Sequence, residues 1–153
     1  MGINVLMCTD GSDLSVRALS DALPVLASAD RTVLLTVQSI VDPEFQTGNG
    51  FTLGPNAPGG DEQIQTSGDR EAKRILDVTV EALGLENVEL MAEAGTPGQT
   101  ICAVAASMEA DVIVIGTHGR SGFRRAVTGS TSDHVVRNAR CPVLVQGAGS
   151  PGR

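Results

Sequence analysis

Short apolar runs and longer stretches with helical periodicity alternate along this chain. Five runs predict β-strands, at residues 3–8, 31–37, 88–94, 112–115 and 142–145. The segments between them repeat apolar residues at helical spacing, most clearly at 16–26, 61–83, 101–108 and 131–138. Strands that alternate with helices pair in parallel through right-handed crossovers. The sequence therefore predicts an α/β fold of three layers, with a doubly wound parallel five-stranded sheet of order 3-2-1-4-5.

Residues at the ends of these elements sharpen the prediction. Ser12 is predicted to cap the first helix, and Pro24 to kink it or end it early, because proline lacks the N–H that a helical turn needs. Thr96 and Pro97 are typical of a helix start, where Gln99 would close a capping box. The segment 38–60 has three prolines, five glycines and no period, so it is either a functional lid or disordered.

A glycine-rich loop follows the fourth predicted strand. Its pattern is Gly116-x2-Gly119-x9-Gly129-Ser130, with Ser130 as the predicted N-cap of the next helix. Glycines let backbone N–H groups approach a phosphate, and the first turn of a helix offers it unpaired N–H groups. The loop is neither a Walker A motif nor a GxGxxG fingerprint. The flanking strand and helix favour an anion site over the alternative, an ordinary flexible loop.

Charged side chains in and near this loop have two interpretations. Arg120, Arg124 and Arg125 either solvate a surface or bring at least one guanidinium group to a phosphate. His118 is interpreted as a solvated or phosphate-facing side chain rather than a general base. His134 is interpreted as a structural residue of the last helix.

Asp10 ends the first predicted strand, as Gly116 ends the fourth. In a sheet of order 3-2-1-4-5 these two strands flank the point where the winding reverses, and ligands bind in the crevice at that point. We therefore expect Asp10 and Gly116 to lie in one site. The alternative role for Asp10 is that of a turn residue whose carboxylate caps local N–H groups.

Composition narrows the class of protein. The 153 residues fit one domain, expected at 1–147 with a C-terminal tail at 148–153, and a formal charge of −7 disfavours binding to nucleic acid or anionic lipid. We identify no signal peptide and no run of about 20 apolar residues, so we expect a cytoplasmic protein without a membrane partner. The sequence has no CxxC motif among its three cysteines, Cys8, Cys102 and Cys141. We therefore expect them to be small buried hydrophobic groups rather than parts of disulfides or of a zinc site.

The loop pattern resembles the nucleotide-binding signature G-2x-G-9x-G-S/T of the universal stress protein family, in its ATP-binding branch. The likeness extends to Thr9-Asp10-Gly11-Ser12, to Gly95-Thr96-Pro97 and to the closing strand at 140–145. The resemblance implies a Rossmann-like fold of the adenine nucleotide alpha hydrolase type. It also implies ATP or another adenine nucleotide as the ligand, together with Mg²⁺, whose protein ligands the sequence does not identify.

The resemblance further assigns residues to the ligand. Asp10 and the backbone at Val37 would hold the adenine and the ribose. The residues expected around the ribose and the phosphates are Gly116, Gly119, Gly129, Ser130 and Thr131, and the candidate set is completed by Thr9, His118 and Arg120. The family more often has an apolar residue at the position of Thr131, which still offers an N–H and a hydroxyl group.

The last predicted strand lies at an edge of the sheet. Val143, Leu144 and Val145 leave an apolar row beside unpaired backbone groups, and proteins cover or pair such edges. The resembled family commonly associates through this strand, so we expect a homodimer. The alternative is that the tail at 147–153 covers the edge.

Three functions are compatible with these features. The first is an ATP-binding stress-response module that couples nucleotide occupancy to loop order or to a protein partner, which the sequence does not identify. The second is a slow ATP hydrolase or adenylyl-transferring enzyme, but we find no HExxH motif, paired carboxylates or Ser/His/Asp arrangement in the sequence. The third is a nucleotide-free interaction protein, which the intact glycine pattern disfavours. We therefore predict binding and assign no catalytic residue.

Overall fold

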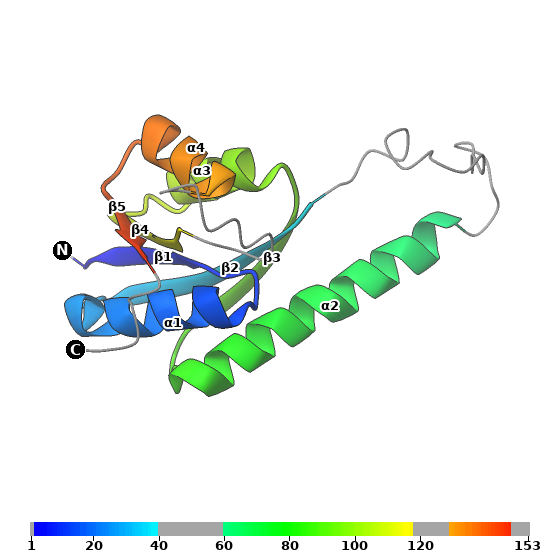
Figure 1. Cartoon of the computed structure of the whole chain (residues 1–153), viewed down its shortest axis with the longest axis horizontal. Helices are drawn as coiled ribbons and strands as arrows, with labels where there is room; N and C mark the ends of the chain where they lie inside the picture. The colour runs from blue at the N-terminus through cyan, green and yellow to red at the C-terminus, as the bar shows by residue number, and fades with distance from the viewer. Residues whose placement is uncertain (1, 40–59, 118–128, 148–153) are drawn as a thin grey trace.

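The computed structural model describes residues 2–39, 60–117 and 129–147 (Figure 1). Its elements are, in order, β1 (Asn4–Cys8), α1 (Asp13–Ala22), the 3-10 helix η1 (Leu23–Leu26), β2 (Arg31–Ser39), α2 (Gly60–Leu83), β3 (Glu89–Gly95), α3 (Pro97–Ser107), β4 (Val112–Gly116), α4 (Ser130–Asn138) and β5 (Val143–Gln146). The strands pair in parallel in the order β3-β2-β1-β4-β5. The predicted fold class and strand order are confirmed.

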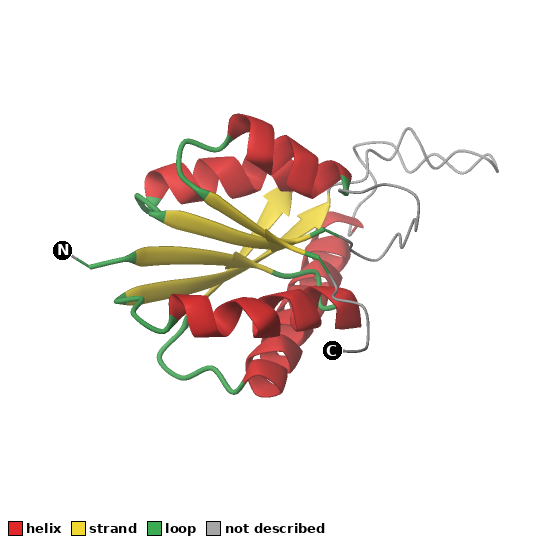
Figure 2. Ribbon diagram, turned by 60° about the vertical axis from the view of Figure 1, so that its left-hand side comes forward, coloured by secondary structure: helices red, strands yellow, loops and turns green. Residues whose placement is uncertain are grey.

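Helices cover both faces of the sheet (Figure 2). On one face, Leu19 of α1 and Leu76 of α2 share a core cluster with Met7 of the central strand β1. On the other face, Val135 of α4 shares a cluster with Leu6. Successive side chains of a strand point to opposite faces, so β1 contributes to both cores. This arrangement leaves the carboxyl ends of the central strands between the two helical layers.

The ends of α1 follow the sequence prediction. The Ser12 hydroxyl accepts a hydrogen bond from the Ser15 amide at 3.2 Å, as expected of an N-cap. The helix ends at Ala22 and continues directly as η1, which contains Pro24. The predicted early end at this proline is therefore confirmed.

The start of α3 differs from the prediction. Thr96 holds the N-cap position, but its side chain makes no capping hydrogen bond, so the predicted capping box with Gln99 is wrong. Backbone geometry starts the helix instead. Pro97 has a φ angle already suited to the first turn, and the Thr100 amide donates to the Thr96 carbonyl at 2.9 Å.

Strand β2 is longer than predicted. The sequence placed the start of an irregular segment at Gln38, but Gln38 and Ser39 pair with Ala94 and Gly95 of β3. Pairing with a neighbouring strand overrides the weak local preference of these residues. The remainder of the expected lid or disordered segment, 40–59, lies outside the described residues.

Helix α2 packs one face on the sheet, as predicted. Ala72, Ile75, Leu76 and Thr79 are buried, whereas the exposed side carries ion pairs such as that of Lys73. Exposed pairs of this kind contribute little stability. Within the part of the chain that the structure describes, no helix is both long enough and apolar enough to cross a bilayer.

The three cysteines are free thiols. Cys8 is buried, and Cys102 and Cys141 are partly buried against the core under α3 and α4. Burial raises the pKa of each thiol above its usual value. A neutral thiol is a poor nucleophile, so these residues act chiefly as small apolar groups. The predicted burial is therefore complete for Cys8 and partial for Cys102 and Cys141.

Helices α3 and α4 come close together at Gly98. A Cβ atom at this position would lie 2.7 Å from Cδ2 and 2.8 Å from Cβ of His134. His134 therefore has the structural role expected from the sequence, because its side chain packs directly on the α3 backbone. This contact helps to hold α4 in place.

We predict that Gly98→Ala lowers the free energy of unfolding by about 1 to 3 kcal/mol, as overpacking of a filled space does. Urea unfolding would measure the change. In the His134→Ala background the same substitution should cost much less, because the obstructing side chain is gone. Equal costs in the two backgrounds would show that the contact with His134 is not the reason for the glycine.

Candidate functional site

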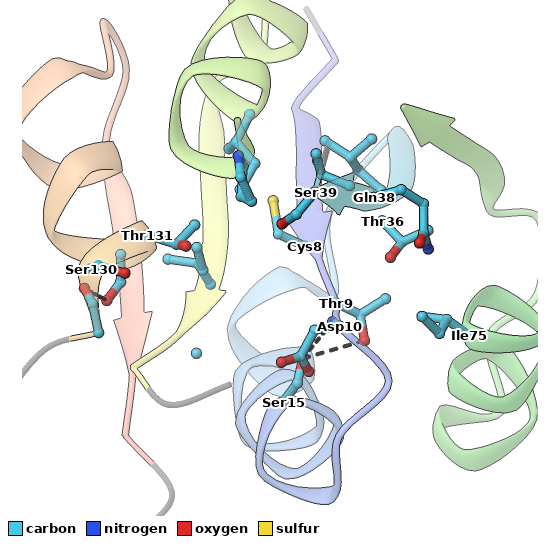
Figure 3. A pocket seen from close by; sticks show the side chains of 18 of the residues that line it. Cys8, Thr9, Asp10, Ser15, Thr36, Gln38, Ser39, Ile75, Ser130 and Thr131 are labelled. Atoms are coloured by element: carbon cyan, nitrogen blue, oxygen red, sulfur yellow. Dashed lines mark hydrogen bonds between the residues drawn. The ribbon is translucent and has the colours of Figure 1, made fainter. Parts of the chain in front are cut away.

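The carboxyl ends of β1, β2 and β4 surround a cavity of about 480 Å³. Figure 3 shows Ser130 and Thr131 of α4 on one side, Thr36 and Gln38 of β2 on the other, and the end of β1 between them. The cavity therefore lies where the winding of the sheet reverses, at the position expected from the strand order.

The cavity brings together candidate residues from distant stretches of the sequence. Seven of the ten predicted site residues line it: Thr9, Asp10, Val37, Gly116, Gly129, Ser130 and Thr131. The other three, His118, Gly119 and Arg120, lie outside the described residues, as do Arg124 and Arg125. Contact between any of these residues and a ligand stays a prediction.

The turn after β1 is organised by the Asp10 carboxylate. Its Oδ1 atom accepts hydrogen bonds from the Ser12 amide at 2.9 Å and from the Ser12 hydroxyl at 2.6 Å. Gly11 lies between them with a φ of 76°, a conformation that favours glycine. The turn role considered as the alternative for Asp10 is therefore present. A ligand can still meet the carboxylate, because Asp10 is only partly buried and lines the cavity.

The opposite side of the cavity is the start of α4. Its N-cap is Gly129, not Ser130 as predicted, and Ser130 is the first helical residue. The Asp133 amide is the first that bonds back within this helix, to the Gly129 carbonyl at 2.9 Å. The amides of Ser130, Thr131 and Ser132 precede it, and a helix supplies no internal partner for such amides. Together with the helix dipole, they form an end that favours an anion.

Gly129 is the N-cap because of a close backbone contact. Its amide donates to the Thr117 carbonyl at 2.7 Å, and a Cβ atom at Gly129 would lie 2.5 Å from that carbonyl oxygen. A side chain at this position would therefore push the two backbones apart. The glycine is required by the packing of the protein itself, whatever its role toward a phosphate. Gly129→Val is consequently not a test of ligand binding alone.

The apolar wall of the cavity was missed by the sequence analysis. It is formed mainly by Leu35, Ile75, Pro97, Ile101 and Ile115. The sequence placed Ile75 and Ile101 on the core faces of their helices, which is correct but incomplete. For Pro97 and Ile101, the available signal was their place in the first turns of a helix that follows the carboxyl end of a strand.

Thr36, Gln38 and Ser39 were also missed, and the predicted irregular segment from Gln38 explains the last two. Gln38 and Ser39 line the cavity because β2 is longer than predicted, and Thr36 lies at the carboxyl end of the predicted strand. These residues add hydroxyl and amide groups to the side of the cavity opposite α4 (Figure 3). The cavity thus combines an apolar wall with hydrogen-bonding groups at both sides.

Asp10 is the only residue with a formal charge at neutral pH among the described residues of the lining. The neighbouring Cys8 is buried, and burial raises the pKa of its thiol, so the cavity holds a neutral sulfhydryl group there. Over residues 2–39, 60–117 and 129–147, no group of three or more His, Cys, Asp or Glu side chains is arranged to hold a metal ion. The described lining is therefore suited to binding an uncharged group beside the sheet and an anion at α4.

Solved structures share this fold. The hypothetical protein MJ0577 superposes with a TM-score of 0.75 at 22% identity, covering 98% of this chain and 99% of that one. A universal stress protein from Archaeoglobus fulgidus in complex with dAMP gives a TM-score of 0.56 at 25% identity, covering 94% of this chain and 97% of that one. Two further universal stress proteins, one in complex with cAMP and one from Arabidopsis thaliana with AMP bound, give TM-scores of 0.63 and 0.62 at 22% and 18% identity, each covering at least 93% of both chains.

Sequence relatives point to the same family. Universal stress protein MJ0531 of Methanocaldococcus jannaschii is 31% identical over 145 residues, which cover 92% of this chain and 79% of the relative. The family model described as "Universal stress protein family" matches residues 3–146. With the sheet order already established from the strand pairing, these matches show that the chain belongs to the universal stress protein family.

Proposed function

We propose that this chain is an ATP-binding member of its family and that nucleotide occupancy controls its association with a partner in a stress response. The observation that carries the proposal is the joining, in one cavity, of the first-turn amides of α4 and the carboxylate turn of β1. The phosphates would lie at Ser130 and Thr131. The adenine and the ribose would lie toward Asp10 and the backbone of Val37.

The chemistry of the cavity supports an adenine nucleotide. Its volume of about 480 Å³ falls within the range of small-molecule sites, about 300 to 1,000 Å³. An apolar wall suits a flat base, and amides at a helix start suit phosphate oxygens. The dAMP complex of the relative from Archaeoglobus fulgidus, at 25% identity, lends further support.

The choice of ATP rests on the glycine pattern that begins at Gly116 and ends at Gly129 and Ser130. Contacts of a triphosphate with His118, Gly119 and Arg120 remain a prediction from this pattern. Mg²⁺ would enter with the nucleotide and be held mainly by its phosphates, because the described lining has one carboxylate only.

Binding is a better proposal than turnover. The described lining of the cavity contains no histidine and no second carboxylate beside Asp10. Oδ1 of Asp10 already accepts two hydrogen bonds from Ser12, which engage this carboxylate oxygen in the turn. We place this function in the cytoplasm, since the cysteines are unpaired thiols, as is usual in a reducing compartment.

The direct test is to purify the full chain, denature it and analyse the released small molecules, followed by calorimetric titration of the nucleotide-free protein with ATP, ADP and AMP. We expect an adenine nucleotide in the extract and the tightest binding for ATP. Absence of binding by all three nucleotides would reject the proposal. Repeated release of ADP from added ATP would identify a hydrolase instead.

Two variants at Asp10 separate its turn role from its ligand role. Asp10→Asn keeps an oxygen that can accept from Ser12 but removes the charge, so we expect little change in melting temperature and about tenfold weaker nucleotide binding, the loss of one charged hydrogen bond. Asp10→Ala should weaken binding and also lower the melting temperature, because the turn loses its acceptor. If Asp10→Asn binds ATP as the unmodified chain does, the carboxylate has a turn role only.

We further propose a homodimer through β5. The Ile113 amide donates to the Pro142 carbonyl at 3.0 Å, and the Thr117 amide to the Gln146 carbonyl at 3.1 Å. Backbone groups of a strand alternate in direction, so those of Val143 and Val145 face away from β4. Their side chains pack against the core under α3 and α4. The outward backbone groups are therefore a ready edge for a second copy. Of the alternative cover, the tail at 147–153, all but Gly147 lies outside the described residues.

Val145→Pro tests this interface through the backbone. Proline removes the outward N–H group and is tolerated on an edge strand, so we expect a folded monomer. Val145→Ala is the matched control, because it shortens the side chain but keeps the N–H, and it should remain dimeric. Light scattering at tens of micromolar protein distinguishes the two states. A monomeric unmodified chain, or a dimeric proline variant, would contradict the proposed interface.

A further inference from the structure

Three buried hydroxyl groups form a continuous chain between α2 and the cavity. Thr79 of α2, Thr9 after β1 and Ser15 of α1 are 0%, 6% and 5% exposed. Oγ1 of Thr79 lies 3.1 Å from Oγ1 of Thr9, and Oγ of Ser15 lies 3.3 Å from the same Thr9 atom. Thr9 and Ser15 line the cavity, whereas Thr79 does not.

The Thr79 end of this series of hydroxyl groups determines which group donates in each of its hydrogen bonds. The Thr79 hydroxyl bonds to the Ile75 carbonyl at 2.8 Å, and a carbonyl can only accept. The single hydroxyl hydrogen of Thr79 is therefore used, and Thr9 must donate to Thr79. Ser15 must then donate to Thr9 for the same reason. Each hydroxyl group therefore donates its single hydrogen toward α2.

The oxygen atoms left as acceptors hold the turn after β1. Oγ1 of Thr9 accepts from the Gly11 amide at 3.1 Å, and Oγ of Ser15 accepts from the Asp10 amide at 3.4 Å. These two amides are therefore already bonded within the protein. The turn consequently offers a ligand the carboxylate of Asp10 and not a set of N–H donors.

Helix α2 holds the same turn through a second contact. A Cβ atom at Gly11 would lie 3.0 Å from Cγ1 of Ile75, so the turn packs directly against that side chain. Ile75 thus contacts the turn with its side chain and fixes the hydroxyl chain with its carbonyl. In Figure 3 the side chains of Thr9 and Ser15 lie beside Asp10, with Ile75 on the α2 side.

We infer that Thr79 is a positioning residue of the nucleotide site. It does not line the cavity itself but acts from α2 on the turn after β1, which does. It sets the direction of the hydrogen bonds among the hydroxyl groups, which keeps the amides of Asp10 and Gly11 bonded within the protein and leaves Asp10 to line the cavity. The consequence for affinity rests on the function proposed above. The effect on the turn does not depend on that function.

The test uses the full chain with three substitutions. Thr79→Val has nearly the same shape but no hydroxyl, Thr79→Ser keeps the hydroxyl, and Ser107→Ala is a control that removes a hydroxyl bonded to a helix carbonyl, that of Val104, away from the cavity. Amide hydrogen exchange without nucleotide measures the protection of the Asp10 and Gly11 amides. Calorimetric titration with ATP measures the affinity.

In Thr79→Val, we expect both amides to exchange several-fold faster and ATP to bind about fivefold more weakly, the effect of one neutral hydrogen bond. Thr79→Ser and Ser107→Ala should resemble the unmodified chain in both measurements. A merely structural role for Thr79 would lower stability without a selective change at these two amides, and that result overturns the inference. Unchanged exchange and affinity in Thr79→Val overturn it as well.

Ser15→Ala gives an independent arm if Thr79→Val does not fold. It removes the acceptor of the Asp10 amide but leaves Thr9 to accept from Gly11, so exchange should accelerate at Asp10 and not at Gly11. Equal protection of the Asp10 amide with and without the Ser15 hydroxyl would overturn the proposed chain. If the unmodified chain binds no ATP, the proposed function fails, and the exchange data still decide whether Thr79 holds the turn.

Discussion

A single backbone hydrogen bond, from the Gly129 amide to the Thr117 carbonyl, determines where α4 begins. It places the N-cap of the helix beside the carboxyl end of β4, so the first-turn amides open into the cavity. Thr117 is bonded in turn to Gln146 at the end of β5. These backbone groups therefore tie the anion-favouring end of the site to the edge strand. A change at that edge would reach the cavity through two hydrogen bonds.

The other end of the site is built from side chains. Asp10, Ser12 and the buried hydroxyls of Thr9 and Ser15 satisfy one another and fix the turn after β1. The two ends thus differ in chemistry, since one presents amide donors and the other a carboxylate acceptor. A ligand with an anionic end and an end rich in N–H or O–H groups is complementary to this arrangement in one orientation only. A fixed arrangement of donors and acceptors of this kind contributes more to the specificity of binding than to its affinity.

The fold could be predicted because its signals are local and repeated. Apolar runs and helical periods gave the alternation of elements, and Pro24 gave the early end of α1. The N-cap of α4 could not be predicted, because the contact that excludes a side chain at Gly129 comes from Thr117, which is close in space but not in local sequence. The predicted capping box at Gln99 was wrong because Pro97 and the backbone hydrogen bond from Thr100 to Thr96 start the helix without it. Local propensity is weaker than such contacts.

The candidate site was predicted in part for the same reason. Residues that follow the ends of strands, such as Asp10 and Gly116, are placed by topology once the strand order is known. The apolar wall needs the positions of helices relative to strands, which no local pattern contains. Ile75 illustrates this, since its periodicity indicates burial but not that it meets both Gly11 and the cavity. The hydrogen bonds among Thr9, Ser15 and Thr79 could not be predicted either, because the helix propensity of a threonine does not indicate which group its hydroxyl contacts.

The hydroxyl groups of Thr9, Ser15 and Thr79 do not titrate, which bears on how the site responds to a change of pH. Serine and threonine side chains neither gain nor lose a proton in the physiological range, unlike histidine, whose charge changes there. Cys8, next to them in the sequence, keeps its proton because burial raises the pKa of its thiol. The hydrogen bonds among the three hydroxyl groups therefore contain no titrating group of their own. Any response of this turn to acidity must therefore come from groups other than these three hydroxyls.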